Sequence, residues 1–174
     1  YKILNKIGQG GMSIVYLAMN ERANKQWAIK GVRKVGVKDY EVVKQGLIAE
    51  TDILKKLSHP NLPSIIDVID CEDTFLIVMD YIEGKALDYW LKKEGAQPQE
   101  KVVEWAKQIC DVLGYLHSRK PPIIYRDLKP ANVMLKPDGK IMIIDFGTAR
   151  EFKETSIEVT SCLGTQRYAA PEQY

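Results

Sequence analysis

The stretch that decides the fold reads YRDLKPAN at residues 125–132 and continues to DFG at residues 145–147. It holds two carboxylates, one cation and one amide in a fixed order, at Asp127, Lys129, Asn132 and Asp145. Between them, two short apolar runs flank the turn sequence Pro-Asp-Gly at residues 137–139, which predicts a β-hairpin. The stretch therefore predicts polar side chains gathered around a short hairpin.

These residue types, in this order, suit the alignment of a hydroxyl group with a metal-bound nucleoside triphosphate. Asp127 can accept the proton of the hydroxyl group, and Lys129 can neutralise the phosphoryl group that moves. Asn132 and Asp145 can hold Mg²⁺ through their oxygens. The stretch thus indicates phosphoryl transfer from a nucleoside triphosphate with the help of Mg²⁺.

The stretch resembles the catalytic core of the eukaryotic-like (Hanks-type) serine/threonine protein kinases, and other motifs follow in that family's order. The first is a glycine-rich segment at residues 8–16, where small residues leave backbone amides able to bind phosphates. Its form is especially similar to that of bacterial serine/threonine kinases. The resemblance implies that ATP is contacted at Gly8, Gly10, Gly11, Ser13 and, over the adenine, Val15.

A lysine and a glutamate form the second motif. Lys30 ends the apolar run Ala-Ile-Lys at residues 28–30, where the family has the lysine that binds the α- and β-phosphates. Its partner is expected on the following helix. We expect Glu50, since the helical spacing places Glu50 on the inward face one turn before Leu54, whereas Asp52 points elsewhere.

The strand and hinge around the adenine form the third motif, at residues 75–84. The resemblance makes Met79 the residue behind the adenine ring, and it implies backbone contacts to the adenine edge at Asp80 and Ile82. Ala28 and Met134 are expected to complete the apolar surface on both sides of the ring, together with Val15.

The last motif runs from residue 164 to residue 172 and resembles the family's closing segment of the activation loop, which holds the peptide substrate. The resemblance implies that Thr165 reaches Asp127 and Lys129 and that the acceptor is serine or threonine rather than tyrosine. It also makes Arg126 the partner of a phosphorylated loop residue. We expect that residue to be Thr160 or Ser161, with Thr155 behind them.

The expected fold is therefore α+β, a protein-kinase-like bilobal fold. Residues 1–82 are expected to form a β-rich N-lobe with one main helix and the hinge. In that lobe the pattern predicts strands in four apolar runs and a helix at about residues 40–57. Residues 83–174 are expected to form a mostly helical, incomplete C-lobe with a long amphipathic helix around residues 102–116.

The resemblance covers residues 1–174, but the family's domain continues with further helices beyond the closing segment. We therefore expect a catalytic domain truncated shortly after Ala-Pro-Glu at residues 170–172. If the chain ends at Tyr174, the uncovered face of the long helix predicts a homodimer or other self-association. A cytoplasmic location is expected, with a parent protein that is tethered to a membrane by analogy with bacterial relatives.

Two other functions stay open. One is a truncated kinase-like nucleotide-binding or regulatory module with little activity. The other is a small-molecule kinase, a class that shares the Asp-Asn-Asp pattern but lacks the closing segment. The net charge of +2 gives no electrostatic case for nucleic acid, and no apolar run approaches the roughly 20 residues of a membrane span. The expected partners are protein substrates.

Overall fold

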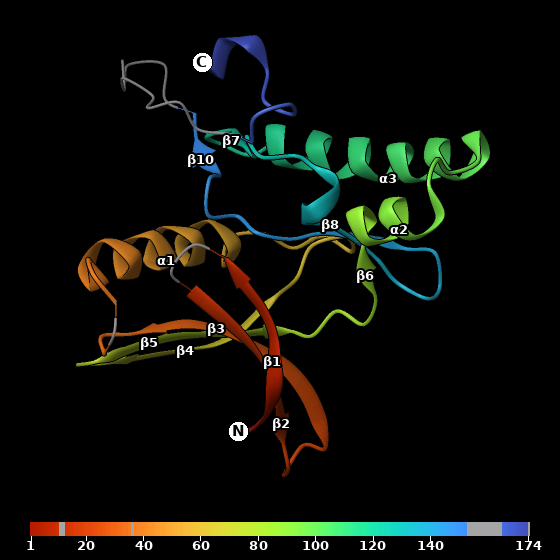
Figure 1. Ribbon diagram of the computed structural model, residues 1–174. Coiled ribbons are helices and arrows are strands. Elements are labelled where there is room, and N and C mark those ends of the chain that lie inside the picture. The colour runs from red at the N-terminus through yellow and green to blue at the C-terminus, as the bar shows by residue number, and fades with distance from the viewer. Residues whose placement is uncertain (11–12, 36, 153–164, 174) are drawn as a thin grey trace. The chain divides into compact units, whose positions relative to one another are not determined.

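The computed structural model describes residues 1–10, 13–35, 37–152 and 165–173. The chain divides into two compact units. The first comprises Tyr1–Leu57 and Pro63–Ile82, and the second comprises Ser58–Leu62 and Glu83–Tyr174. Figure 1 labels most of the helices and strands of both units.

The first unit is built on a five-stranded antiparallel sheet with the order β1-β2-β3-β5-β4. The four apolar runs that predict strands lie in β2 to β5, and β1 ends within the glycine-rich segment, at Gly10. The strand bounds are Lys2–Gly10 (β1), Ser13–Asn20 (β2), Lys25–Arg33 (β3), Ile65–Cys71 (β4) and Thr74–Asp80 (β5).

The helix of the first unit, α1, runs along this sheet from Tyr40 to Leu54 (Figure 1). It begins where the sequence predicts but ends before the predicted residue 57. The reason is a tighter turn after Leu54, in which the amides of Lys56 and Leu57 bond to the carbonyls of Ile53 and Leu54. Leu47 of α1 packs with Phe75 and Ile77 of β5 in one buried cluster, and this contact sets the face that the helix turns inward.

The second unit combines helices with short strands. The predicted hairpin is formed by β8 and β9, whose register pairs Val133 with Ile143 and Leu135 with Ile141. The elements of this unit are β6 (Lys85–Ala86), α2 (Leu87–Glu94), α3 (Gln99–His117), β7 (Ile123–Ile124), η1 (Pro130–Asn132), β8 (Val133–Leu135), β9 (Ile141–Ile143), β10 (Arg150–Glu151) and η2 (Pro171–Gln173).

The predicted amphipathic helix is α3. It buries Trp105, Val112 and Leu116, as its apolar spacing predicts, whereas Val102 is 45% and Val103 44% exposed. The shorter helix α2 was not predicted. Its 8 residues bury only Leu87, so the sequence offers too few apolar positions to show a helical period.

A short segment, Ser58–Leu62, lies in the second unit although the sequence analysis placed it with residues 1–82. Hydrogen bonds that involve side chains explain this placement. The Asn61 amide donates to the carbonyl of Ile141 at 2.7 Å and to Gln108 Oε1 at 3.0 Å, and the Ser58 amide donates to the Tyr115 hydroxyl oxygen at 2.8 Å. Polar pairing across distant sequence positions leaves no periodic signal.

Among the described residues, no helix combines the length and the apolar character that a bilayer-spanning segment requires.

Two glycines inside helices give a prediction on stability. A Cβ added at Gly46 of α1 or at Gly114 of α3 would meet no atom of the described residues within 4 Å. Replacement of either glycine by alanine removes backbone freedom from the unfolded chain, so each variant is expected to raise the free energy of unfolding by about 0.5–1 kcal/mol. Urea titration measures this. Gly31→Ala is the control and should destabilise, since its Cβ would lie 2.6 Å from the Phe75 carbonyl oxygen. Unchanged stability in both helix variants would contradict the prediction.

Candidate active site

An ion pair joins β3 to α1 inside the first unit. Lys30 Nζ donates to both carboxylate oxygens of Glu50, at 2.6 and 2.8 Å. The two side chains are 14% and 3% exposed. The lysine and glutamate named from the sequence are thus brought together. Lys30 lies on the same face of β3 as the buried Val32, which packs against α1, and α1 buries Glu50 against the sheet. Asp52 lies on the outer side of α1 and pairs with Lys55 at 2.5 Å.

The residues expected around the nucleotide in the first unit lie on its strands. Val15 of β2 is in register with Lys30, and Ala28 of β3 with Met79 of β5. Asp80 ends β5, where its carboxylate accepts a hydrogen bond from the amide of Ser64 at 2.9 Å. The other members of the set are Gly8 and Gly10 on β1, the buried Ser13 at the start of β2, and Ile82 after β5; Gly11 lies outside the described residues.

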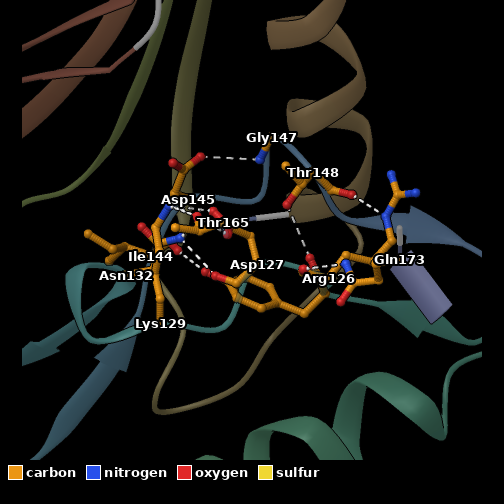
Figure 2. A network of polar contacts seen from close by, with 11 residues as sticks. Arg126, Asp127, Lys129, Asn132, Ile144, Asp145, Gly147, Thr148, Thr165 and Gln173 are labelled. Carbon is orange, nitrogen blue, oxygen red and sulfur yellow. Dashed lines mark hydrogen bonds and ion pairs between the residues drawn. The ribbon is translucent and has the colours of Figure 1, made fainter. Parts of the chain in front are cut away.

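A three-way polar cluster lies in the second unit and joins the YRDLKPAN segment to the closing segment (Figure 2). Lys129 Nζ lies 2.8 Å from Asp127 Oδ2 and donates to Thr165 Oγ1 at 2.5 Å. The Thr165 hydroxyl in turn donates to Asp127 Oδ1 at 2.7 Å. Both oxygens of the Asp127 carboxylate are therefore held by the two residues that the resemblance associates with it.

Asn132 also forms hydrogen bonds with Asp127, and its backbone bonds to the segment that carries Asp145. Its side-chain nitrogen donates to the backbone oxygen of Asp127 at 2.9 Å and to Oδ2 at 3.1 Å. The carbonyl of Asn132 accepts the amide of Ile144 at 3.0 Å, which brings the residue before Asp145 beside it. Asp145 is exposed, and its φ of 65° turns the chain sharply into the following Phe146.

Tyr125 and Phe146 are buried next to this cluster. Their side chains are 2% and 0% exposed, and their rings meet edge to face with centroids 5.1 Å apart. The planes of the two rings are tilted by 71°. The reason is the Tyr125 hydroxyl, which donates to the carbonyl of Ile144 and so orients the ring.

Comparison with known proteins decides the family. The protein kinase domain family matches residues 1–173 of the sequence. The chain belongs to the protein kinase family. The predicted resemblance to Hanks-type kinases and the predicted fold class are thereby confirmed. Protein kinases as a family transfer phosphoryl groups from ATP.

Its relatives include bacterial and eukaryotic kinases. Myosin light chain kinase A of Dictyostelium discoideum is 35% identical over 99% of this chain and 58% of its own length. A probable serine/threonine-protein kinase of Clostridium perfringens and the serine/threonine-protein kinase PrkC of Bacillus subtilis are each 34% identical over 99% of this chain, and over 25% and 26% of their own lengths. The kinase chain described here thus spans 58% or less of the length of these relatives.

The pKa of the Asp127 carboxyl group in this kinase lies below its ordinary value of 3.8. Burial acts in the opposite direction and raises the pKa, but it is outweighed by the hydrogen bonds from Lys129 and Thr165 and by the charge of Lys129. Asp127 is therefore ionised at neutral pH. Because its folded-state pKa is depressed, its stabilising effect is present above pH 3.8 and is lost as the pH falls through the lower folded-state value.

Lys129→Met tests this balance. The substitution removes the cation that lowers the pKa and leaves the burial that raises it, so the pKa of Asp127 is expected to rise above that of the wild type. NMR titration of the carboxyl carbon measures the value. Lys107→Met, at a lysine that is 68% exposed and pairs with Glu104, is the control and should leave the pKa of Asp127 unchanged. A pKa of Asp127 that stays or falls in Lys129→Met would refute the explanation.

Arg126 lies beside the aspartate in a left-handed backbone conformation with φ of 68°. Its Nε donates to the carbonyl of Thr148 at 2.8 Å, just after the DFG segment. The loop residues that were expected to be phosphorylated, Thr160 and Ser161, lie outside the described residues. The side chain of Arg126 is thus attached to the start of the loop that carries them.

Two contacts of the kinase site were missed from the sequence. The Thr148 hydroxyl donates to the carbonyl of Tyr125 at 3.2 Å, and the Gln173 amide donates to the carbonyl of Arg126 at 2.9 Å. In both contacts the acceptor is a backbone carbonyl oxygen, and the identity of the acceptor residue does not reveal such a bond. A hydroxyl group next to DFG and an amide next to Ala-Pro-Glu were the only available signals.

Proposed function

We propose that this kinase chain transfers the γ-phosphate of ATP to serine and threonine hydroxyl groups of proteins. The observation that carries the proposal is the cluster of Asp127, Lys129 and Thr165, in which a carboxylate with a lowered pKa is held on both oxygens. Its relatives named serine/threonine-protein kinases support the choice of acceptor. The intact set of polar residues argues against a module that only binds nucleotide.

The chemistry of the donor groups fits Mg²⁺. Within the described ranges no three His, Cys, Asp or Glu side chains come close enough to form a metal site by themselves. Mg²⁺ with a nucleotide needs no such site, since it takes one or two protein ligands together with phosphate and water oxygens. The Asn132 side chain directs its nitrogen to Asp127, so its Oδ1 would be the ligand atom, and the exposed Asp145 carboxylate would supply the second ligand. When bound, Mg²⁺ neutralises charge on the phosphates.

The side chains of the second unit act on the acceptor. Asp127 orients the incoming hydroxyl group by accepting its hydrogen bond, and it takes the proton late in the reaction. Lys129 neutralises charge on the phosphoryl group. Thr165 holds Lys129 and Asp127 in place, because its hydroxyl group bonds to both side chains. Most of the rate gain then comes from positioning and from preorganised charge.

The first unit acts on the nucleotide. Lys30 binds the α- and β-phosphates, and Glu50 holds the ammonium group of Lys30 in place. Gly8 is proposed to bind phosphate through its backbone. A Cβ at this position would lie 3.6 Å from Val15, which is an ordinary contact distance. Packing against the described residues therefore does not require glycine at position 8, and binding of phosphate by the backbone gives a reason for it.

Regulation by loop phosphorylation belongs to the same proposal. Arg126 is the residue that would bind phosphate on Thr160 or Ser161, since a guanidinium group makes strong bonds to phosphate. Self-association, a cytoplasmic location and membrane tethering of the parent protein stay predictions as well. The exposed Val102 and Val103 of α3 favour coverage of that helix by a further element or a second copy.

Radiolabelled γ-phosphate transfer to a mixed protein substrate tests the proposed function. We expect incorporation into serine and threonine, loss of incorporation with excess EDTA, and recovery with added Mg²⁺. Asp145→Asn should need more Mg²⁺ for the same rate. Absence of transfer under all conditions, or transfer only to small molecules, would reject the proposal.

A further inference from the structure

The peptide groups of residues 125–127 are fastened by side chains from three different segments (Figure 2). Thr148 donates to the carbonyl of Tyr125 at 3.2 Å, Gln173 to that of Arg126 at 2.9 Å, and Asn132 to that of Asp127 at 2.9 Å. The successive carbonyls that lead to the catalytic carboxylate thus each accept a side-chain hydrogen bond. Thr148 directly follows DFG, Gln173 directly follows Ala-Pro-Glu, and Asn132 is the last residue of YRDLKPAN.

Gln173 is the most informative of these donors because its amide group is used at both ends. Its Nε2 donates to the carbonyl of Arg126, and its Oε1 accepts the amide of Ala170 at 2.9 Å. This pairing fixes which end of the amide group faces Arg126. The side chain therefore links the turn at residues 170–173 to the peptide group that joins Arg126 to Asp127.

That peptide group follows a residue whose backbone conformation is energetically unfavourable. Arg126 adopts a φ of 68°, a conformation that a residue with a side chain rarely takes and that needs support from its surroundings. Arg126 receives this support on both sides, since its Nε donates to Thr148 and its carbonyl accepts from Gln173. A rotation of this peptide group would move Asp127 away from Lys129 and Thr165.

We infer that Gln173 is a positioning residue, which holds the Arg126–Asp127 peptide group and thereby couples the closing segment to the orientation of the Asp127 carboxylate. Gln173 directly follows that closing segment, and Thr165 within the segment makes a second connection, directly to Asp127 at 2.7 Å. Displacement of the closing segment would therefore disturb both the side chain and the backbone of Asp127. The inference rests on the proposed function for its kinetic consequences only.

Gln173→Glu is the sharpest test, because the side chain keeps its size and keeps an oxygen for the Ala170 amide but loses the donor to Arg126. In the full-length protein we expect kcat to fall about 10-fold or more, with the KM for ATP changed by less than about 2-fold. Gln99→Glu makes the same chemical change at an exposed position at the start of α3 and should leave both parameters at the wild-type value. Gln173→Met removes the donor without adding charge and should reproduce the fall in kcat.

Amide hydrogen exchange provides a readout that does not need activity. Gln173→Glu and Gln173→Met should speed exchange in residues 125–132 without speeding it in α3, and Gln99→Glu should change neither. Thr148→Val should have a similar effect on residues 125–132, whereas Thr148→Ser keeps the hydroxyl group and should restore the wild-type pattern. Wild-type kcat and wild-type exchange in both Gln173 variants would overturn the inference, as would a general loss of protection across the second unit. An inactive wild type would overturn the proposed function, while exchange would still decide the role of Gln173.

Discussion

Asp127→Asn is expected to lower the rate of phosphoryl transfer about 10³-fold, within the usual range for loss of a general base. The asparagine keeps the size of the side chain, so the fold should stay intact. It can still accept the hydrogen bond from Thr165, but it carries no charge for Lys129 and cannot take a proton from the acceptor. Single-turnover transfer of γ-phosphate measures the effect, and ATP affinity measured by calorimetry should change little.

Asp52→Asn is the matched control for this substitution. Asp52 makes an exposed ion pair with Lys55, of a kind that contributes roughly 0–1 kcal/mol, and it lies on the outer side of α1. The control variant should keep the wild-type transfer rate. A transfer rate in Asp127→Asn within a few-fold of the wild type would show that the carboxylate of Asp127 is not the base.

Lys30→Met is expected to have the second large effect, on both catalysis and stability. It removes the cation proposed to bind the phosphates, so kcat/KM for ATP should fall about 10²-fold or more. It also leaves the Glu50 carboxylate, which is 3% exposed, without the lysine that donates to both of its oxygens. Removal of one partner from a buried pair costs about 3 kcal/mol, a large part of the stability of a small domain.

Lys44→Met provides the comparison, because Lys44 also joins α1 to the sheet by an ion pair. Lys44 Nζ lies 2.6 Å from Asp70 Oδ1, but the Asp70 side chain is 52% exposed. Water can therefore solvate Asp70 when its partner is removed, so Lys44→Met should lose clearly less stability than Lys30→Met. Urea titration of both variants measures the difference. Equal losses of stability, or an unchanged kcat/KM in Lys30→Met, would contradict the account of the Lys30–Glu50 pair.

The residues with chemistry could be found from the sequence because their spacing follows from local structure. Helical spacing places Glu50 and Asp52 on opposite sides of α1. In the structure Glu50 pairs with Lys30, whereas Asp52 pairs with Lys55. The strands β2 to β5 and the helix α3 carry enough apolar residues to reveal their periods. Their roles in catalysis remain part of the proposal.

The features that escaped prediction depend on tertiary contacts. Helix α2 buries too little to show a period, and Ser58–Leu62 joins the second unit through the Asn61 side chain. The role of Gln173 depends on a carbonyl group 47 residues away in the sequence. Such bonds need the folded backbone to be known, since every residue has a carbonyl group and none is distinguished by its side chain.

The measurement that tests the central claim most directly is the initial rate of phosphorylation of three peptides that differ only in their acceptor residue. The wild-type protein, with ATP and Mg²⁺, is expected to phosphorylate the serine and threonine peptides. The tyrosine peptide should react at less than about one hundredth of their rate, since the cluster around Asp127 is proposed to fit a short aliphatic hydroxyl group. Comparable rates for tyrosine, or no phosphorylation of any peptide, would contradict the account.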